Sequence, residues 1–454
     1  GFPMEKKRNT FSGGLGFVLA AAGSAVGLGN IWRFPYLAAK YGGGIFLLVY
    51  IILVFTFGYS LMVAENAIGR RSGKSPLDAF KTLNKKWAFL GVIALIIPCV
   101  ILPYYNVIGG WVLKYLVAYV TGTAQEAAGE SYFTDMLSQP WVLLIGQTIY
   151  TFINVIILMR GVQKGVERVC TILMPILVVL AIAISVYSVT LPGAIEGVKY
   201  FLIPDFSNFS ISSVLAAMGQ MFYSLSLAMG IMVAYGSYLP KDSSLEKNVG
   251  KIELFDTFIA VIAGLMIIPA VFAFSGGDPD ALNKGPGLMF QTLPKVFASM
   301  PLSNIMGAAF FFLVFAAAIT SSMSIMETIV ACVCDHFGMG RKKAVLLVGI
   351  LSWLVSFLPS LGYSVLSWVE ILGFNILDFM DFITNAVLMP ICSLLTCLFV
   401  SIGIGVKVIE QEVCISGEFK RRRLFDVMIK YIAPVFVCAI LISSVLEAFG
   451  VIAF

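Results

Sequence analysis

The chain alternates between long apolar runs and short polar connections. The run from Phe46 to Ala64, FLLVYIILVFTFGYSLMVA, holds no charged residue. About 20 helical residues cross the roughly 30 Å hydrocarbon core of a bilayer. The pattern therefore predicts an all-α polytopic membrane protein with eleven transmembrane helices. They are expected near residues 14–37, 43–69, 88–120, 141–158, 167–190, 213–239, 253–274, 304–334, 343–358, 381–405 and 431–453.

Composition supports this prediction, because 59% of the 454 residues are hydrophobic and only 12% are charged. Soluble domains carry about 25% charged residues. A transmembrane β-barrel would show alternating segments of about ten residues, which this sequence lacks. The eight cysteines predict no structural disulfide. Cys332, Cys334 and His336 predict packing rather than a metal site, because residues two apart on a helix face different directions.

The basic residues indicate how the chain lies in the membrane. With the N-terminus in the cytoplasm, 24 of the 30 Lys and Arg residues fall in cytoplasmic segments. The positive-inside rule then predicts a multi-pass protein of the inner (plasma) membrane with an extracellular C-terminus. The basic residues are scattered over short connections, so we expect no nucleic-acid partner; membrane lipid is the expected surrounding, and no obligate protein partner is evident.

Two of the runs are interrupted by small and polar residues. The first holds Gly23-Ser24-Ala25-Val26-Gly27-Leu28-Gly29-Asn30, and the sixth holds Ser224-Leu225-Ser226-Leu227-Ala228-Met229-Gly230. Glycine disfavours a helix interior by about 1 kcal/mol relative to alanine. Close packing through small residues is one interpretation. Paired interruptions five spans apart, in helices that run in opposite directions, favour the broken helices of a transporter site.

At these residues the chain resembles the neurotransmitter:sodium symporter family. The longest match is Ala22-Gly23-Ser24-Ala25-Val26-Gly27-Leu28-Gly29-Asn30-Ile31-Trp32-Arg33-Phe34-Pro35-Tyr36, followed by Gly42-Gly43-Gly44; shorter matches are 103–105, 219–227 and 320–322. The resemblance implies a LeuT-type 5+5 inverted repeat plus one additional helix. It divides the chain into a cytoplasmic segment 1–13, a first repeat 14–190, an extracellular connection 191–212, a second repeat 213–405, and a cytoplasmic loop with the eleventh helix, 406–454.

The resemblance implies a sodium-coupled symporter of hydrophobic L-amino acids that works by alternating access. Gly27 leaves room for a substrate carboxylate, which is expected to meet the Leu28 and Gly29 amides and the Tyr105 hydroxyl. The ammonium group is expected at the carbonyls of Ala25, Tyr223 and Ser224 and the Ser226 hydroxyl. The side-chain pocket is expected to comprise Ile101, Tyr223, Met229, Ser324 and Ile325. Flexible Met229 predicts a substrate range that reaches aromatic side chains.

Two sodium ions are the cofactors that the resemblance implies, because freed carbonyls and hydroxyls supply the oxygens that a hard cation prefers. Site 1 is expected to use Ala25, Asn30, Ser224 and Asp256, and site 2 to use Gly23, Val26, Ala317, Thr320 and Ser321. Asp256 could instead be an interfacial residue; as a site residue it predicts that no chloride is required. The alternative for Thr320 and Ser321 is hydroxyls that bond to their own helix.

Charged pairs are expected to gate both ends. Arg33 with Asp381 would close the outside, although this could be a buried structural pair. Arg8 with Asp335, helped by Phe11 and Tyr238, would close the cytoplasmic side. Local unwinding between Gly165 and Pro175 could admit water to sodium site 2.

Three other function classes remain to be weighed. An ion channel and an intramembrane enzyme fit poorly, since the halves are inverted and the only histidine lies at the rim. A non-transporting amino acid sensor of the same fold stays open.

Overall fold

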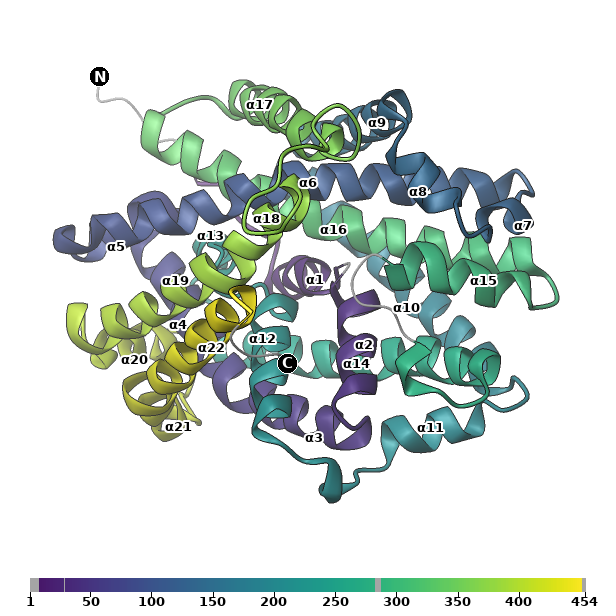
Figure 1. The fold of residues 1–454 in the computed structure, drawn as a ribbon. Helices are drawn as coiled ribbons and strands as arrows, with labels where there is room; N and C mark the ends of the chain where they lie inside the picture. Colours follow the sequence, from purple (N-terminus) through teal and green to yellow (C-terminus); the bar gives the residue numbers. More distant parts are fainter. Residues whose placement is uncertain (1–7, 28, 282–286, 451–454) are drawn as a thin grey trace.

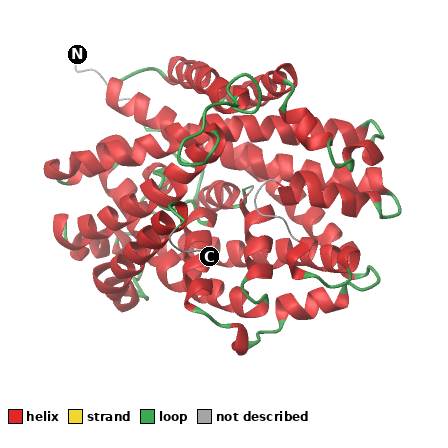
Figure 2. Cartoon of the chain, in the orientation of Figure 1, coloured by secondary structure: helices red, strands yellow, loops and turns green. Residues whose placement is uncertain are grey.

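The expected spans are present as helices. The computed structural model of the protein describes residues 8–27, 29–281 and 287–450. Helices, in red in Figure 2, form nearly all of the described chain. The η segments are π-helical except η3, η5 and η6, which are 3-10 helices. In chain order the spans are α1 (Gly14–Ala25), η1 (Gly29–Arg33) and α2 (Phe34–Lys40); α3 (Gly44–Leu53), η2 (Val54–Gly58) and α4 (Tyr59–Ser72); α6 (Ala88–Val120); α9 (Pro140–Met159); η4 (Val162–Glu167) and α10 (Arg168–Val189); α12 (Ile211–Ser224) and α13 (Ile231–Ser237); α14 (Leu245–Ser275); α16 (Ser303–Phe337); α17 (Arg341–Leu361); α18 (Ile376–Phe382), η8 (Ile383–Leu388), α19 (Met389–Leu398) and η9 (Phe399–Gly403); and α21 (Arg422–Val427), η10 (Met428–Ile432) and α22 (Ala433–Ala448).

The remaining helices lie in the connections. They are α5 (Pro76–Leu83), η3 (Lys85–Trp87), α7 (Ala124–Ala127), α8 (Tyr132–Leu137), α11 (Ile195–Leu202), η5 (Phe206–Asn208), η6 (Pro279–Ala281), η7 (Leu288–Thr292), α15 (Leu293–Ala298) and α20 (Val406–Cys414).

Nine continuous helices in the described residues are long and apolar enough to cross a membrane. The bent pair of α1 with η1 and α2 is a tenth, and α12 with α13 corresponds to the remaining predicted span. Several helices extend beyond the apolar runs; α14 starts at Leu245, where the Ser244 side chain accepts a hydrogen bond from the Lys247 amide at 3.4 Å. Hydropathy marks the lipid-embedded part of a helix, whereas capping marks its end.

The two broken helices lie at the centre of the bundle. Figure 1 shows α1 nearly end-on in the middle of the molecule, with α2 leaving it at an angle, and the two axes are inclined by 66°. Long α6 packs against α16 and α9, and α1 packs against α16, α14 and α10. The broken segments therefore face other helices rather than lipid, as open backbone in a membrane requires.

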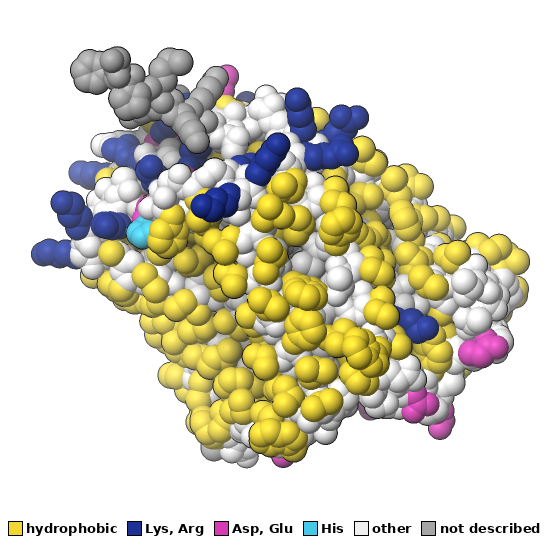
Figure 3. Space-filling model, turned by 90° about the horizontal axis from the view of Figure 1, so that it is seen from above, with side chains coloured by type: hydrophobic (Ala, Val, Ile, Leu, Met, Phe, Trp, Pro, Cys, Tyr) yellow, Lys and Arg dark blue, Asp and Glu magenta, His cyan; other side chains and the backbone are white. Residues whose placement is uncertain are grey.

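The surface separates apolar and charged side chains. In Figure 3 hydrophobic side chains cover most of the visible face, most of the Lys and Arg side chains gather toward one end, and the Asp and Glu side chains are divided between the two ends. This is the distribution of a multi-pass protein whose basic connections lie on one side of the bilayer.

Candidate functional site

The first break is shorter than the sequence predicts. Gly23, Ser24 and Ala25 are still in α1, and Val26, with ψ at 81°, is the first residue after the helix. Leu28, expected to bind the carboxylate, lies outside the described residues. Gly23 stays helical because it packs closely, so that a Cβ there would stand 3.1 Å from both the Cys170 Sγ and the Thr320 Cβ.

The second break covers Leu225 to Gly230, so Ser224 is the last residue of α12 rather than part of the break. Ser226, Ala228 and Gly230 have φ of 55°, 62° and 80°, in the left-handed region. Two of them are not glycine, and such backbone costs of order 1–3 kcal/mol per residue unless neighbours hold it.

Side chains from other elements hold the two breaks together. The hydroxyls of Ser24 and Ser226 are 2.7 Å apart, which links one break to the other. The buried Glu65 carboxylate of α4 accepts a hydrogen bond from the Ala228 amide at 3.2 Å. Sequence analysis missed Glu65, although an acid inside an apolar run is itself a signal of function.

Oxygens converge where sodium site 2 is expected. The Ser321 Oγ lies 3.3, 3.0 and 3.3 Å from the carbonyl oxygens of Gly23, Ser24 and Val26, and the Thr320 Oγ1 lies 3.1 Å from the Ala317 oxygen. One hydroxyl has a single hydrogen, so it can satisfy only one of three carbonyls. The carbonyl lone pairs that receive no hydrogen are suitable ligands for a small hard cation. The alternative interpretation, a hydroxyl that bonds to its own helix, holds for Thr320 but not for Ser321. The sequence analysis did not predict the Ser24 carbonyl as a member of this site.

The residues expected at sodium site 1 lie between α1, α12 and α14. Asp256 is buried, about three turns from the first residue of α14. Its carboxylate accepts hydrogen bonds from the Ser224 hydroxyl and from the Tyr50 hydroxyl, the latter at 2.6 Å. The buried Asn30 amide has no hydrogen-bond partner among the described residues, and Ala25 is the last residue of α1.

A cavity of about 690 Å³ lies between the two breaks and the residues of the expected outer gate, Arg33 and Asp381. Gly29, Tyr105 and Tyr223 line it, as expected for substrate contacts. A Cβ on Gly29 would stand 2.0 Å from the Tyr223 ring, so glycine lets this ring lie over the end of the first break. The other expected pocket residues are buried and do not line the cavity in this conformation: Ile101, Ser226, Met229, Ser324 and Ile325.

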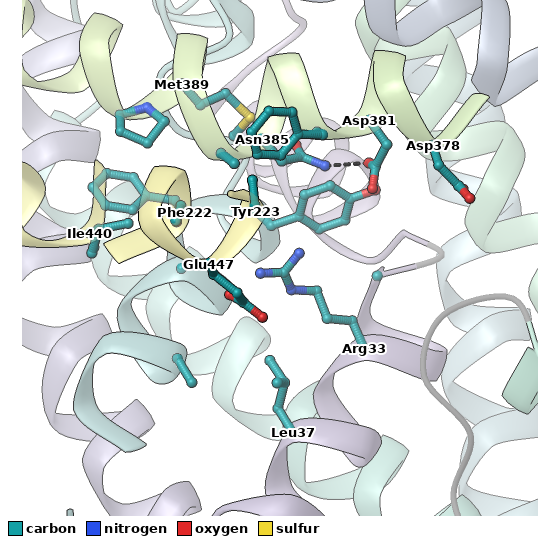
Figure 4. Close-up of a pocket in the computed structure, with 18 of the residues that line it drawn as sticks. Arg33, Leu37, Phe222, Tyr223, Asp378, Asp381, Asn385, Met389, Ile440 and Glu447 are labelled. Carbon is teal, nitrogen blue, oxygen red and sulfur yellow. Dashed lines mark hydrogen bonds between the residues drawn. The ribbon is translucent and has the colours of Figure 1, made fainter. Parts of the chain in front are cut away.

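The two ends of the molecule differ in the state of their charged pairs. The Arg33 guanidinium points into the cavity, 5.8 Å from the Tyr223 ring centroid and on the side of Glu447 (Figure 4). Among the described residues Arg33 makes no ion pair with Asp381, which instead accepts hydrogen bonds from Tyr104 and Asn385. The contacts of the described residues thus do not include the expected outer ion pair, and both of its members line the cavity.

The opposite end is closed. Arg8 makes an ion pair with Asp335 at 2.7 Å and donates to the Ser237 hydroxyl at 2.8 Å. Its guanidinium lies 5.2 Å from the Tyr238 ring centroid, and the Phe11 amide donates to the Tyr238 carbonyl. The expected pair is thus in contact, whereas its role as a gate stays a prediction.

The expected unwinding in the fifth span is not seen in this conformation. Gly165 lies in the π-helical η4, where a Cβ would stand 2.2 Å from the Ile157 carbonyl oxygen, and α10 continues through Pro175.

Comparisons with known proteins agree with this arrangement. Residues 8–140 and 133–451 match the sodium:neurotransmitter symporter family. An uncharacterized sodium-dependent transporter of Bacillus subtilis, YhdH, is 39% identical over 406 residues, covering 88% of this chain and 89% of that protein. An uncharacterized sodium-dependent transporter of Haemophilus influenzae is 33% identical over 457 residues, covering 97% and 99%. The crystal structure of MhsT in complex with L-phenylalanine is similar with a TM-score of 0.86 and 38% identity, covering 96% of this chain and 100% of that one.

These similarities extend over nearly the whole chain and confirm the expected LeuT-type helical fold of a polytopic membrane protein. The relatives are named as sodium-dependent transporters, which agrees with the oxygens gathered between the first broken helix and α16. The protein is a sodium-coupled symporter, and the chain belongs to the sodium:neurotransmitter symporter family.

Proposed function

We propose that the protein carries hydrophobic L-amino acids together with two sodium ions by alternating access. The observation that supports this best is the Ser321 hydroxyl set against three carbonyl oxygens of the first broken helix. A bound cation would satisfy lone pairs that a single hydroxyl hydrogen leaves facing one another. The second ion would lie at Asp256 and Ser224 with the Asn30 amide, which has no hydrogen-bond partner in the described part of the chain.

The substrate class is argued from Gly27. A Cβ on Gly27 would stand 2.7 Å from the Ser321 Oγ and 3.1 Å from the Tyr105 Oη, so the space between these hydroxyls exists only because the residue is glycine. A substrate carboxylate there would reach the Tyr105 hydroxyl and the positive end of η1. MhsT, whose structure holds L-phenylalanine, is a precedent for a hydrophobic amino acid.

Asp256 supports transport without chloride. It is a buried carboxylate next to the expected ion, so the site carries its own negative charge. A second anion would add repulsion in a medium of low dielectric constant.

The orientation is also a proposal. The Arg8–Asp335 pair lies beside a basic connection, because Asp335 also accepts a hydrogen bond from the Ser75 amide, which directly follows the basic stretch 70–74. This end would therefore face the cytoplasm and the Arg33 end the outside. Arg33 would meet Asp381 when the outer side closes over bound substrate.

Uptake into proteoliposomes tests the proposal. An inward sodium gradient should drive accumulation of labelled L-leucine, and the double variant Thr320→Ala, Ser321→Ala should abolish it. Ser352→Ala is a matched control, because its hydroxyl bonds only to a carbonyl of its own helix α17, at 3.1 Å. Binding of leucine without accumulation by the wild-type protein would refute symport and favour the sensor.

A further inference from the structure

An arginine from the connection between the tenth and eleventh spans reaches the helix that carries Asp256. The two guanidinium nitrogens of Arg421 donate to the two carboxylate oxygens of Glu253 at 3.0 and 2.5 Å. Glu253 lies in α14, and its side chain is fully buried. A bidentate pair of this kind fixes the relative orientation of the two side chains as well as the distance between them.

The same guanidinium is held from a second helix. Its Cζ lies 3.5 Å from the centroid of the Tyr59 ring, and one nitrogen lies 3.4 Å from the Phe55 carbonyl oxygen. Planar stacking and paired hydrogen bonds use the properties of arginine that lysine lacks. Arg421 therefore joins α14 to the helix formed by α3, η2 and α4.

The connection itself is firmly attached. Arg70, at the end of α4, donates to the Glu412 carboxylate at 2.9 Å and to the Ser243 carbonyl at 2.8 Å. The Lys420 amide donates to the Glu246 carboxylate at 2.8 Å. The connection that carries Arg421 is therefore hydrogen-bonded to both α4 and α14.

Glu253 and Asp256 are three residues apart on α14, so they are neighbours on its surface. Asp256 must reach Ser224 and Tyr50 at the same time, and Tyr50 belongs to the helix that also supplies Tyr59. We propose that Arg421, through Glu253, is a positioning residue for the sodium ion at Asp256. It fixes this turn of α14 against the second span at the register that places the Asp256 carboxylate between its two hydroxyls.

This inference rests on the proposed function, because it takes Asp256 as a sodium ligand. The test measures the sodium dependence of labelled L-leucine binding to the purified full chain, with thermal unfolding as a check of folding. Arg421→Met alone leaves a buried unpaired carboxylate, which is strongly destabilising. The double variant Arg421→Met, Glu253→Gln removes the link without leaving that charge.

We expect the double variant to raise the half-saturating sodium concentration at least fivefold, with little change in maximal binding or in leucine affinity at saturating sodium. Arg421→Lys, which keeps the charge, should recover part of the loss. Arg422→Met is the matched control, since Arg422 is exposed and lies 3.5 Å from Glu410, and it should stay within twofold of wild type. A folded double variant with the wild-type sodium response would overturn the inference. Wild-type binding that needs no sodium would overturn the proposed function and this inference with it.

Discussion

Replacement of Gly27 by alanine tests the geometry of the central site. The φ of Gly27 lies outside the left-handed region, so alanine meets no backbone strain there. Its Cβ would stand 2.7 Å from the Ser321 Oγ, where ordinary contact begins at 3.4 Å. The Tyr105 Oη, at 3.1 Å, blocks the movement of the new methyl group toward the cavity. The hydroxyl of Ser321 must therefore move.

The magnitude follows from what Ser321 loses. Its oxygen lies 3.0 to 3.3 Å from three carbonyl oxygens at the end of α1, and rotation away from the new methyl group removes it from this set. A buried polar group left without its partner costs about 1–3 kcal/mol. If that loss falls on the sodium-bound state, sodium affinity should decrease by roughly 5- to 150-fold.

The assay is the sodium titration of the thermal stability of the purified protein without substrate, because alanine at residue 27 would also fill the space proposed for the substrate carboxylate. Gly250→Ala is the matched control, because a Cβ at this helical glycine has no atom within 4 Å. Alanine there should leave the sodium response unchanged and favour the helix by about 0.5–1 kcal/mol. The reasoning is refuted if Gly27→Ala titrates with sodium like wild type, or if Gly250→Ala shows the same loss.

Three further predictions concern the gate, the ion and the substrate range. Asp335→Asn removes the charge that pairs with Arg8, so labelling of the buried Cys170 by a thiol reagent should rise several-fold; an equal rise in a Cys170→Ser background would contradict this. Replacing chloride by gluconate should leave leucine uptake unchanged because Asp256 supplies the negative charge; loss of uptake would show that chloride is needed. Tryptophan should compete with leucine for uptake because Met229 is flexible, and the broad range is wrong if excess tryptophan has no effect.

The fold could be predicted because membrane spans are read from a one-dimensional pattern. Each apolar run became a helix or a broken helix, since backbone in lipid must satisfy its hydrogen bonds locally. The extents of the breaks could not be predicted in the same way. Glycine is a poor helix former, yet Gly23 remains in α1 because it fits closely beneath Cys170 and Thr320. Tertiary packing overrides intrinsic propensity there.

Some residues of the candidate site could likewise be predicted from the sequence and others could not. Thr320, Ser321, Arg8 and Asp335 were found because they lie in motifs or at positions that the family resemblance marks, and the structure brings their predicted neighbours together. The contacts of Glu65 with Ala228, and of Arg421 with Glu253, join residues more than 160 positions apart. The local sequence around Glu65 or Arg421 does not indicate which distant residue it contacts, so these contacts are found only in the folded chain.

The arrangement of the closed end suggests why ion release and opening would be coupled. The Arg8 pair joins the segment before α1 to the end of α16, and the oxygens around Ser321 join the C-terminal end of α1 to the middle of α16. Sodium at that site and the ion pair at the rim would therefore stabilise one and the same contact between α1 and α16. A rigid-body movement of the whole of α1 away from α16 would open the Arg8 end and also draw the Gly23 and Val26 carbonyls away from Ser321. On the proposed function, opening that end would weaken the ion site directly, and a separate release mechanism is not needed.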